Sequence, residues 1–221
     1  MRIWSDSFAN GADIPAACAF AVAAPDTHVK LSSNRNPHVA WDDVPPGTES
    51  LVLICHDPDV PMDPRRVNIE GRTVPLTAPR MDFFHWTLAD IPVCLKSLAE
   101  GMFSDMVTPH GKPGPLAPHA IKNGTEHQLR QGVNDYTGWF ASDPDMAGEF
   151  YGYDGPCPPW NDERVHHYVF TLYALDIPRL PLVGRFTGLE ARMAIHGYIL
   201  DEAHIFGTYA LNPQAVADLP K

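Results

Sequence analysis

Two side chains in the carboxyl-terminal third of the chain are the first candidates for chemistry. His166 and Tyr168 lie in the run 165–175, VHHYVFTLYAL, whose β-branched and aromatic residues predict a strand. Alternate residues of a strand share a face, so His166, Tyr168 and Phe170 point the same way. An imidazole beside a phenol at the mouth of an apolar slot suits a phosphate or a carboxylate. The alternative is a strand edge with solvated polar tips.

A carboxylate follows a second predicted strand. The apolar run 51–56, LVLICH, is followed by the segment 57–61, DPDVP, which reads as a rigid corner because its two prolines restrict the backbone. Either X-Pro bond of this corner is a candidate for the cis form. Asp57 is placed there to orient an imidazole or to bind an ammonium group. The alternative is an Asx turn, in which Asp57 bonds only the following amides.

A third predicted strand and a proline-rich loop supply the remaining candidates. His85 lies in the run 83–88, FFHWTL, either as a core residue or as a donor to a pocket. The loop 153–160, YDGPCPPW, has little conformational freedom, and it forms either a pocket wall or an ordinary turn. Its Pro158 and Pro159 are the candidate wall residues.

Composition limits the classes of partner. The chain has 221 residues, 44% hydrophobic residues and 23 prolines, as expected of one β domain, residues 1–221, with long loops. A formal net charge of -11 and the lack of a basic cluster beyond Arg65 and Arg66 disfavour nucleic acid as a partner. No apolar run predicts a signal peptide or integral membrane contact. We therefore expect a cytoplasmic protein whose four cysteines are reduced.

The remaining elements complete a β-rich fold. Thr187 and Glu190 form a capping box that starts a helix, with an apolar stripe of Leu189, Met193, His196 and Leu200. A last strand is expected at about 203–211. Between residues 101 and 155 the pattern dissolves into Pro-, Gly- and Asp-rich sequence, which is either an ordered cover or a flexible flap. Strands early and one helix late predict an antiparallel sandwich.

The order of these segments resembles the phosphatidylethanolamine-binding family. Within it, the chain is most similar to the bacterial and archaeal YbhB/YbcL type, also called Raf-kinase-inhibitor-like proteins. The resemblance extends to 36–45, NPHVAWDDVP, and 205–209, IFGTY. It implies an antiparallel Greek-key β-sandwich with helices near the carboxyl end and a ligand pocket. The residues implied as its lining are Asp57, Pro61, His85, Pro158, Pro159, His166 and Tyr168.

The sequence departs from this family at two places that flank the expected pocket entrance. The stretch 62–82 is longer than usual, and 101–155 carries extra residues, so access to the pocket and its choice of ligand are open. Cys157 stands where a small residue is usual; its thiol is either a reactive pocket group or a buried, inert one.

The resemblance and the residues together predict a binding protein that does not turn over its ligand. A phosphate-bearing ligand such as a phosphoethanolamine head group would accept hydrogen bonds from His85, His166 and Tyr168, while Asp57 fixes an imidazole tautomer. No catalytic residue, metal or cofactor is assigned. One alternative is a protein-interaction module that regulates a kinase or protease, with an unidentified protein partner or a homodimer. Another is a metal-dependent hydrolase that uses Asp57, Asp59, His85 and His166.

Overall fold

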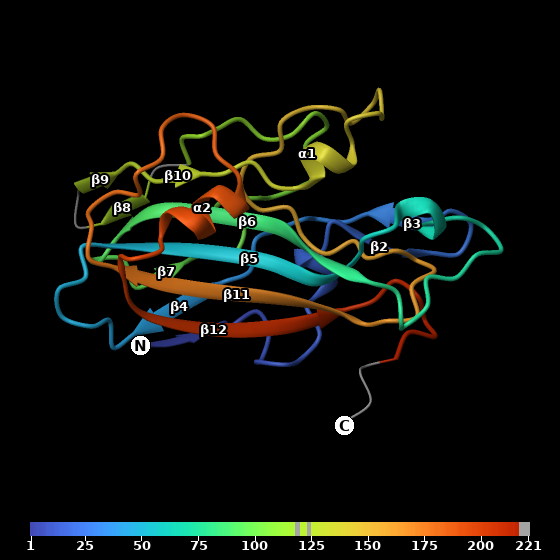
Figure 1. Cartoon of the computed structure of the whole chain (residues 1–221), viewed down its shortest axis with the longest axis horizontal. Helices are drawn as coiled ribbons and strands as arrows, with labels where there is room; N and C mark the ends of the chain where they lie inside the picture. Colours follow the sequence, from blue (N-terminus) through green and yellow to red (C-terminus); the bar gives the residue numbers. More distant parts are fainter. Residues whose placement is uncertain (118–119, 123–124, 217–221) are drawn as a thin grey trace.

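The computed structural model describes residues 1–117, 120–122 and 125–216, and it is built mainly from antiparallel strands (Figure 1). No helix among these residues is long and apolar enough to cross a membrane. The strands are β1 (Arg2–Trp4), β2 (Ala21–Ala24), β3 (His28–Leu31), β4 (Val39–Asp42), β5 (Ser50–Pro61), β6 (Arg80–Pro92), β7 (Ser97–Leu98), β8 (Ala120–Lys122), β9 (Thr125–His127), β10 (Arg130–Gln131), β11 (His166–Leu175) and β12 (Ile199–Tyr209), and the α-helices are α1 (Tyr136–Trp139) and α2 (Gly188–Ala194).

The largest sheet has five strands in the order β10-β6-β5-β11-β12. β5 and β6 are neighbours, β10 follows beside β6, and β11 returns after a long connection to pair with β5. This is the 4-1-2-3 order of a Greek key. A three-stranded sheet, β1-β4-β7, packs against one face of it, and β2-β3 and β8-β9 form separate two-stranded ladders. The predicted antiparallel β-rich fold is confirmed.

β5 is buried on both faces, which explains its unbroken apolar sequence. Leu51, Leu53 and Cys55 point into the main core between the two sheets, where they meet side chains of β4, β6 and β11. Val52 and Ile54 point to the other face, where α2 and the loop before it cover the sheet. A strand with one solvated face would have alternated between apolar and polar residues instead.

The segment 57–61 is not the corner that the sequence suggested. It continues β5, which runs from Ser50 to Pro61, and the pairing with β6 becomes irregular between Asp57 and Val60. Such a bulge accommodates a proline, which cannot donate a ladder hydrogen bond. The cis peptide bond of the described chain is Gly114–Pro115, so neither bond in this segment is cis. β6 also extends beyond the predicted 83–88, to Arg80–Pro92.

The capping box at α2 is confirmed, but the predicted apolar stripe is wrong. The Thr187 side chain accepts from the Glu190 backbone, and the Glu190 carboxylate accepts from Thr187. The helix is short, and it packs on the sheet through its small residue Ala191 and through Ile195. Leu189 and Met193 are therefore on the solvent side, 54% and 66% exposed. Leu200, the end of the proposed stripe, belongs to β12, which begins earlier than the predicted 203.

The region 101–155 contains structure of its own, apart from residues 118–119 and 123–124, which lie outside the described residues. It carries β8, β9, β10 and the single helical turn α1. α1 lies over the end of the large sheet near β2 and β3 (Figure 1). Its aromatic side chains pack with Phe20 and Phe150 in a small core. Within its described residues, this region packs over the end of the large sheet, and the choice between an ordered cover and a flexible flap stays open.

We expect Gly188→Ala to destabilise the protein by about 1 to 3 kcal/mol, the usual cost of overpacking. A Cβ at this position would lie 2.2 Å from the buried ring of Phe84, so the first turn of α2 would be pushed off the sheet. Urea unfolding measures the effect. Met193→Ser, on the exposed side of the same helix, is the control and should stay within about 0.5 kcal/mol of wild type. Equal stability of Gly188→Ala and wild type would contradict this packing.

Candidate functional site

The predicted site residues all line one cavity of about 460 Å³. The cavity lies where β5 ends and where β6 and β11 begin. The antiparallel register brings these ends together, since Asp57 pairs with Phe83 on one side and His56 pairs with Val169 on the other. The residues that the sequence proposed and the structure assembles there are Asp57, Pro61, His85, Pro158, Pro159, His166 and Tyr168.

A β-bulge aims His85 at the cavity. Successive residues 55–56 of β5 pair with Trp86 and Phe84, so His85 has no partner in β5. A bulge of this kind turns one side chain out of the regular alternation. Trp86 still reaches the main core, Phe84 packs on the opposite face, and the His85 ring stands edge-on to Tyr168 with centroids 5.1 Å apart. Strict alternation would have placed His85 and Tyr168 on different faces.

His166 is fully buried between two carboxylates. Its Nδ1 donates to Asp57 Oδ2 at 2.7 Å, and its Nε2 donates to Asp162 Oδ2 at 3.2 Å. Burial lowers the pKa of His166, but the Asp57 carboxylate and the hydrogen bonds to Asp162 and Asp57 outweigh it and raise this pKa to about 9. His166 is therefore a cation at neutral pH, and both of its N–H groups are occupied.

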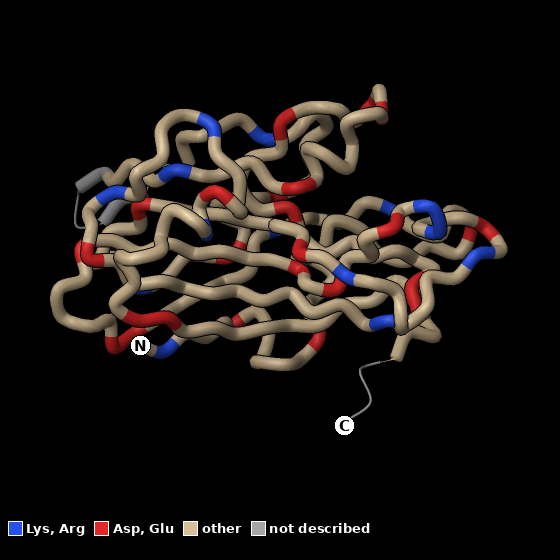
Figure 2. The backbone as a smooth tube through the Cα atoms, viewed as in Figure 1, with Lys and Arg blue, Asp and Glu red and all other residues tan. Residues whose placement is uncertain are grey.

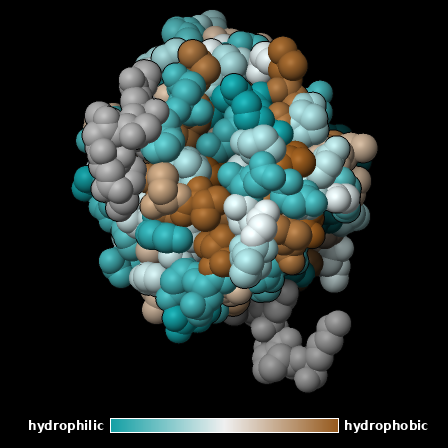
Figure 3. Space-filling view, turned by 90° about the vertical axis from the view of Figure 1, so that its left-hand side faces the viewer, coloured by the Kyte–Doolittle hydropathy of each residue, from teal (hydrophilic) through white to brown (hydrophobic). Residues whose placement is uncertain are grey.

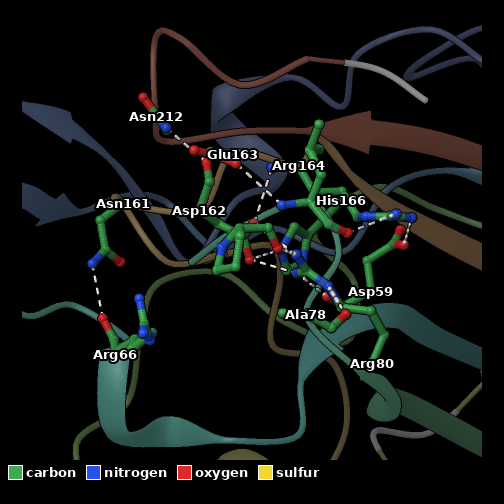
Figure 4. Close-up of polar contacts among 12 residues, drawn as sticks. Asp59, Arg66, Ala78, Arg80, Asn161, Asp162, Glu163, Arg164, His166 and Asn212 are labelled. Carbon is green, nitrogen blue, oxygen red and sulfur yellow. Dashed lines mark hydrogen bonds and ion pairs between the residues drawn. The ribbon is translucent and has the colours of Figure 1, made fainter. Parts of the chain in front are cut away.

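Asp162 is itself held by arginine. Arg80 donates two hydrogen bonds to its carboxylate, at 2.6 and 3.0 Å (Figure 4). Burial raises the pKa of Asp162, but the hydrogen bonds from His166 and Arg80 prevail and lower it. The neighbouring Asp59 carboxylate contacts Arg164 and His167 instead of the cavity. The result is a charged network behind the cavity wall.

His85 offers the cavity an acceptor. Its Nδ1 must donate to the Asp154 carbonyl oxygen, 2.7 Å away, because a carbonyl can only accept. Burial lowers the pKa of His85 to about 4 despite the nearby Asp57 carboxylate, so the ring is neutral at pH 7. In this tautomer Nε2 carries a lone pair, and Nε2 is the ring nitrogen left for a ligand.

Asp154 anchors this arrangement from the loop side. Its fully buried carboxylate accepts from Asn34 at 2.6 Å, from Asn134 at 2.8 Å and from Lys112 at 2.7 Å. Its backbone N–H donates to the His85 carbonyl oxygen at 3.1 Å, so the two residues are bonded in both directions. Hydrogen bonds between Asp154 and His85 thereby connect the region 101–155 to strand β6.

The Tyr168 hydroxyl is buried and has no well-formed hydrogen bond with any residue that the structure describes, although the Asp57 carboxylate lies close enough to interact with it. The side chain is only 1% exposed and lines the cavity. Burial, and then the Asp57 carboxylate, raise its pKa well above the ordinary value, so it remains a phenol. Buried polar groups in folded proteins nearly always have a partner, so this hydroxyl requires an explanation.

Aromatic side chains that sequence reasoning did not assign form the remaining wall. The Tyr136 ring stacks on Phe20 with centroids 4.5 Å apart and on Phe140 at 5.6 Å. Its hydroxyl donates to the Gly155 carbonyl oxygen at 2.8 Å. The spacing of Tyr136, Trp139 and Phe140 at i, i+3 and i+4 was the signal that could have found them, because it places all three on one side of a helical turn.

Two mechanistic expectations do not fit this geometry. His166 was expected to donate to a ligand, yet both of its ring N–H groups are bonded to carboxylates. The metal alternative required Asp57, Asp59, His85 and His166 to converge. Within residues 1–117, 120–122 and 125–216, no group of three or more His, Cys, Asp or Glu side chains is placed to hold a metal ion.

Cys157 lines the cavity, and burial raises the pKa of its thiol to about 12, as expected of an inert thiol.

The sequence and the fold match a known family. The family model described as phosphatidylethanolamine-binding protein matches residues 4–210. The chain therefore belongs to the phosphatidylethanolamine-binding protein family.

Bacterial UPF0098 proteins are among its relatives. A UPF0098 protein of Aquifex aeolicus (strain VF5) is 29% identical over 209 residues, which cover 95% of this chain and 88% of the relative. The UPF0098 protein YbhB of Escherichia coli (strain K12) is 28% identical over 177 residues, 80% of this chain and 82% of YbhB. The crystal structure of E. coli YbcL, described as a member of the mammalian PEBP family, has a TM-score of 0.63 at 21% identity, covering 95% of this chain and 97% of YbcL. This last likeness shows the shared fold.

The charge of His166 predicts a loss of stability in alkaline solution. Its folded pKa of about 9 lies above the unfolded value of about 6.5, so the stabilisation is complete below about pH 6.5 and is lost as pH rises through about 9. The loss should amount to about 3 kcal/mol. We expect His166→Gln to remove this slope in urea unfolding measured between about pH 6 and pH 9.5.

His85→Gln is the matched control for this titration. The folded pKa of His85 is about 4, so its contribution varies only below about pH 6.5, and this variant should keep the alkaline slope of wild type. At each pH, the difference between the free energies of unfolding of the two variants cancels the contribution of cysteine thiols that titrate in the same range. An alkaline slope that is the same in wild type and His166→Gln would show that His166 is not held as a cation.

Proposed function

We propose that this protein binds the phosphate group of a small phosphate-bearing ligand in the cavity and does not turn it over. The observation that carries the proposal is the Tyr168 hydroxyl, which is buried, lines the cavity and has no well-formed hydrogen bond with any described residue. An unpaired buried hydroxyl costs about 1 to 3 kcal/mol. A phosphate oxygen that accepts from it would offset this cost. Membership of a family named for phosphatidylethanolamine supports the same class of ligand.

The cavity provides different surroundings for the two ends of such a ligand. Three of its buried polar groups, Asp57, His85 and Tyr168, lie together at the ends of β5, β6 and β11. Phe20, Phe140 and other apolar side chains line most of the rest, so they would contact the organic part of the ligand. A few hydrogen bonds to a charged group, less the costs of binding, correspond to affinities from micromolar to millimolar.

The chemistry of the lining supports binding over catalysis. The Cys157 thiol, with its pKa raised to about 12, is a poor nucleophile at neutral pH. His166 is saturated by two carboxylates, so its ring has no lone pair with which to accept a proton from a substrate. Lys and Arg positions are interspersed with Asp and Glu along the chain (Figure 2), which supports the expectation of no nucleic-acid partner. The cytoplasmic location and a homodimer stay predictions.

The alternative of a protein-interaction regulator has one supporting observation of its own. Apolar side chains on α2 and its neighbours are exposed, among them Val183 at 94% and Met193 at 66%. The end of the molecule where β5 and β12 begin shows hydrophobic residues between hydrophilic ones (Figure 3). This end is remote from the cavity, so a partner bound there would not be displaced by phosphoethanolamine. Competition in a pull-down distinguishes this surface from one at the cavity.

Tyr168→Phe tests the proposed function because it should weaken ligand binding without lowering the stability of the fold. We expect the affinity for phosphoethanolamine, measured by calorimetry, to fall about tenfold to a hundredfold, because a hydrogen bond to a charged group is lost. The melting temperature should be unchanged or higher, because the substitution removes an unpaired buried hydroxyl. Tyr173→Phe, on the other face of β11 and outside the cavity lining, is the control and should bind like wild type. Equal affinity of wild type and Tyr168→Phe would contradict the proposal.

A further inference from the structure

A second cavity, of about 570 Å³, lies between the start of β3, the segments 73–76 and 160–163, and the carboxyl-terminal residues 212–216. Its volume is within the range of small-molecule sites. It shares no described lining residue with the cavity at the ends of β5, β6 and β11. We propose that this second cavity binds a neutral sugar ring, either free or at the end of a glycan. This inference does not depend on the phosphate-binding function.

Backbone hydrogen bonds hold the walls of the second cavity in place. The Val74 N–H donates to the Asn161 carbonyl oxygen at 3.0 Å, and the Val74 carbonyl oxygen accepts from the Glu163 N–H at 3.0 Å. The buried Asn161 side-chain amide also donates to the Arg66 carbonyl oxygen at 2.9 Å (Figure 4). On the other side, the Val216 N–H donates to the Glu163 carbonyl oxygen at 2.9 Å. Residues 161–163 thus join two segments distant in sequence, so the cavity is formed before a ligand binds.

Two stacked rings form an aromatic wall of this cavity. The Trp160 and His28 rings are almost parallel, with centroids 3.8 Å apart and an interplanar angle of 7°. His28 Nε2 contacts the Glu70 carboxylate at 3.0 Å, and the Trp160 backbone N–H donates to Asn68 Oδ1 at 3.1 Å, so both residues are held. A sugar ring has a side made mainly of C–H groups. Their slight positive charge suits the electron-rich surface of aromatic rings.

The remaining lining offers both hydrogen-bond donors and hydrogen-bond acceptors. Within the described part of the chain, the Thr73 hydroxyl, the Gln214 side-chain amide and the Trp160 indole N–H form no hydrogen bond. One carboxylate oxygen of Glu163 accepts from the Leu76 backbone N–H at 3.2 Å, which leaves the other oxygen for a ligand. A sugar hydroxyl both donates and accepts, so it can replace the water molecule at each of these groups.

The charge of the lining favours a neutral ligand. The described lining residues include one carboxylate, that of Glu163, and no Lys or Arg. An anion would therefore approach a carboxylate without a compensating cation, in a chain of net charge -11. A cation could use Glu163 and the Trp160 ring, but it would leave the indole N–H and the amide N–H groups without an acceptor. A ring with several hydroxyl groups satisfies the donors and the acceptors together.

Saturation-transfer NMR on the full chain tests the site with the methyl glycosides of glucose, galactose, mannose and N-acetylglucosamine. We expect at least one glycoside to bind with a dissociation constant in the millimolar range, as suits a few hydrogen bonds in an open site. Sorbitol has similar hydroxyl groups but no ring, so it should bind at least about tenfold more weakly. Saturating phosphoethanolamine should leave the sugar signal unchanged, because the two cavities are separate.

Variants assign the binding to the second cavity. Trp160→Leu removes the aromatic wall and should weaken the binding of the glycoside at least about tenfold. Thr73→Val and Gln214→Ala each remove a hydrogen-bonding group and should weaken it about threefold to tenfold. Both positions are exposed, so these two variants decide the test if Trp160→Leu does not fold. Trp4→Leu is the matched control, since Trp4 is 42% exposed on β1 and lines neither cavity; it should bind like wild type.

A disaccharide that carries the bound sugar at its non-reducing end distinguishes the two sources of the ligand. A higher affinity for the disaccharide than for the methyl glycoside would assign the site to the end of a glycan, and equal affinities would assign it to a free sugar. Both results support the proposal.

Four results would overturn the sugar site. They are no binding of any glycoside to folded wild type, unchanged binding in Thr73→Val and Gln214→Ala, tighter binding of tetramethylammonium than of every glycoside, and loss of the sugar signal when phosphoethanolamine is added. The third would assign the cavity to amines, and the fourth would place the sugar in the first cavity. The phosphate-binding function is tested separately by Tyr168→Phe, so either proposal can fail while the other stands.

Discussion

The buried His166 cation is the interaction on which the site depends. Its ring joins Asp57 at the end of β5 to Asp162 in the loop before β11, and Arg80 from β6 completes the chain of contacts. Removing His166 would leave the buried Asp57 carboxylate without its charged partner, which proteins avoid at high cost. The three central strands are therefore held in register at the end where the cavity opens.

A second buried carboxylate, that of Asp154, attaches the loops to the sheet. Asp154 receives hydrogen bonds from Asn34, Asn134 and Lys112, which come from segments far apart in the chain, and its backbone bonds His85 in both directions. The long region 101–155 is thus attached to the sheet at the point where it must shape the cavity. Its aromatic residues then replace solvent over the site. Part of this region forms one wall of the cavity.

The two histidines of the site show how position decides chemistry. His166 lies between carboxylates and is a cation, with a pKa raised to about 9, whereas burial beside a carbonyl oxygen lowers the pKa of His85 to about 4. Neither titrates near the ordinary value of about 6.5. The buried end of the cavity therefore presents a neutral ring, a carboxylate and the Tyr168 hydroxyl.

The sequence by itself determined the β-rich fold, the strands and the residues that meet in the cavity, because strand periodicity, the capping box and the order of family motifs are local properties of the chain. Only the tertiary structure decided what those residues can do. The bulge that turns His85 into the cavity depends on the pairing of β5 with β6, and the outward side of α2 depends on the sheet beneath it. The partners of His166, Asp162 and Asp57, are 4 and 109 residues away, and neither separation is a recognisable signal. Hydrogen-bond donors become free or occupied only when such distant groups meet, so the charge state of each side chain follows from packing.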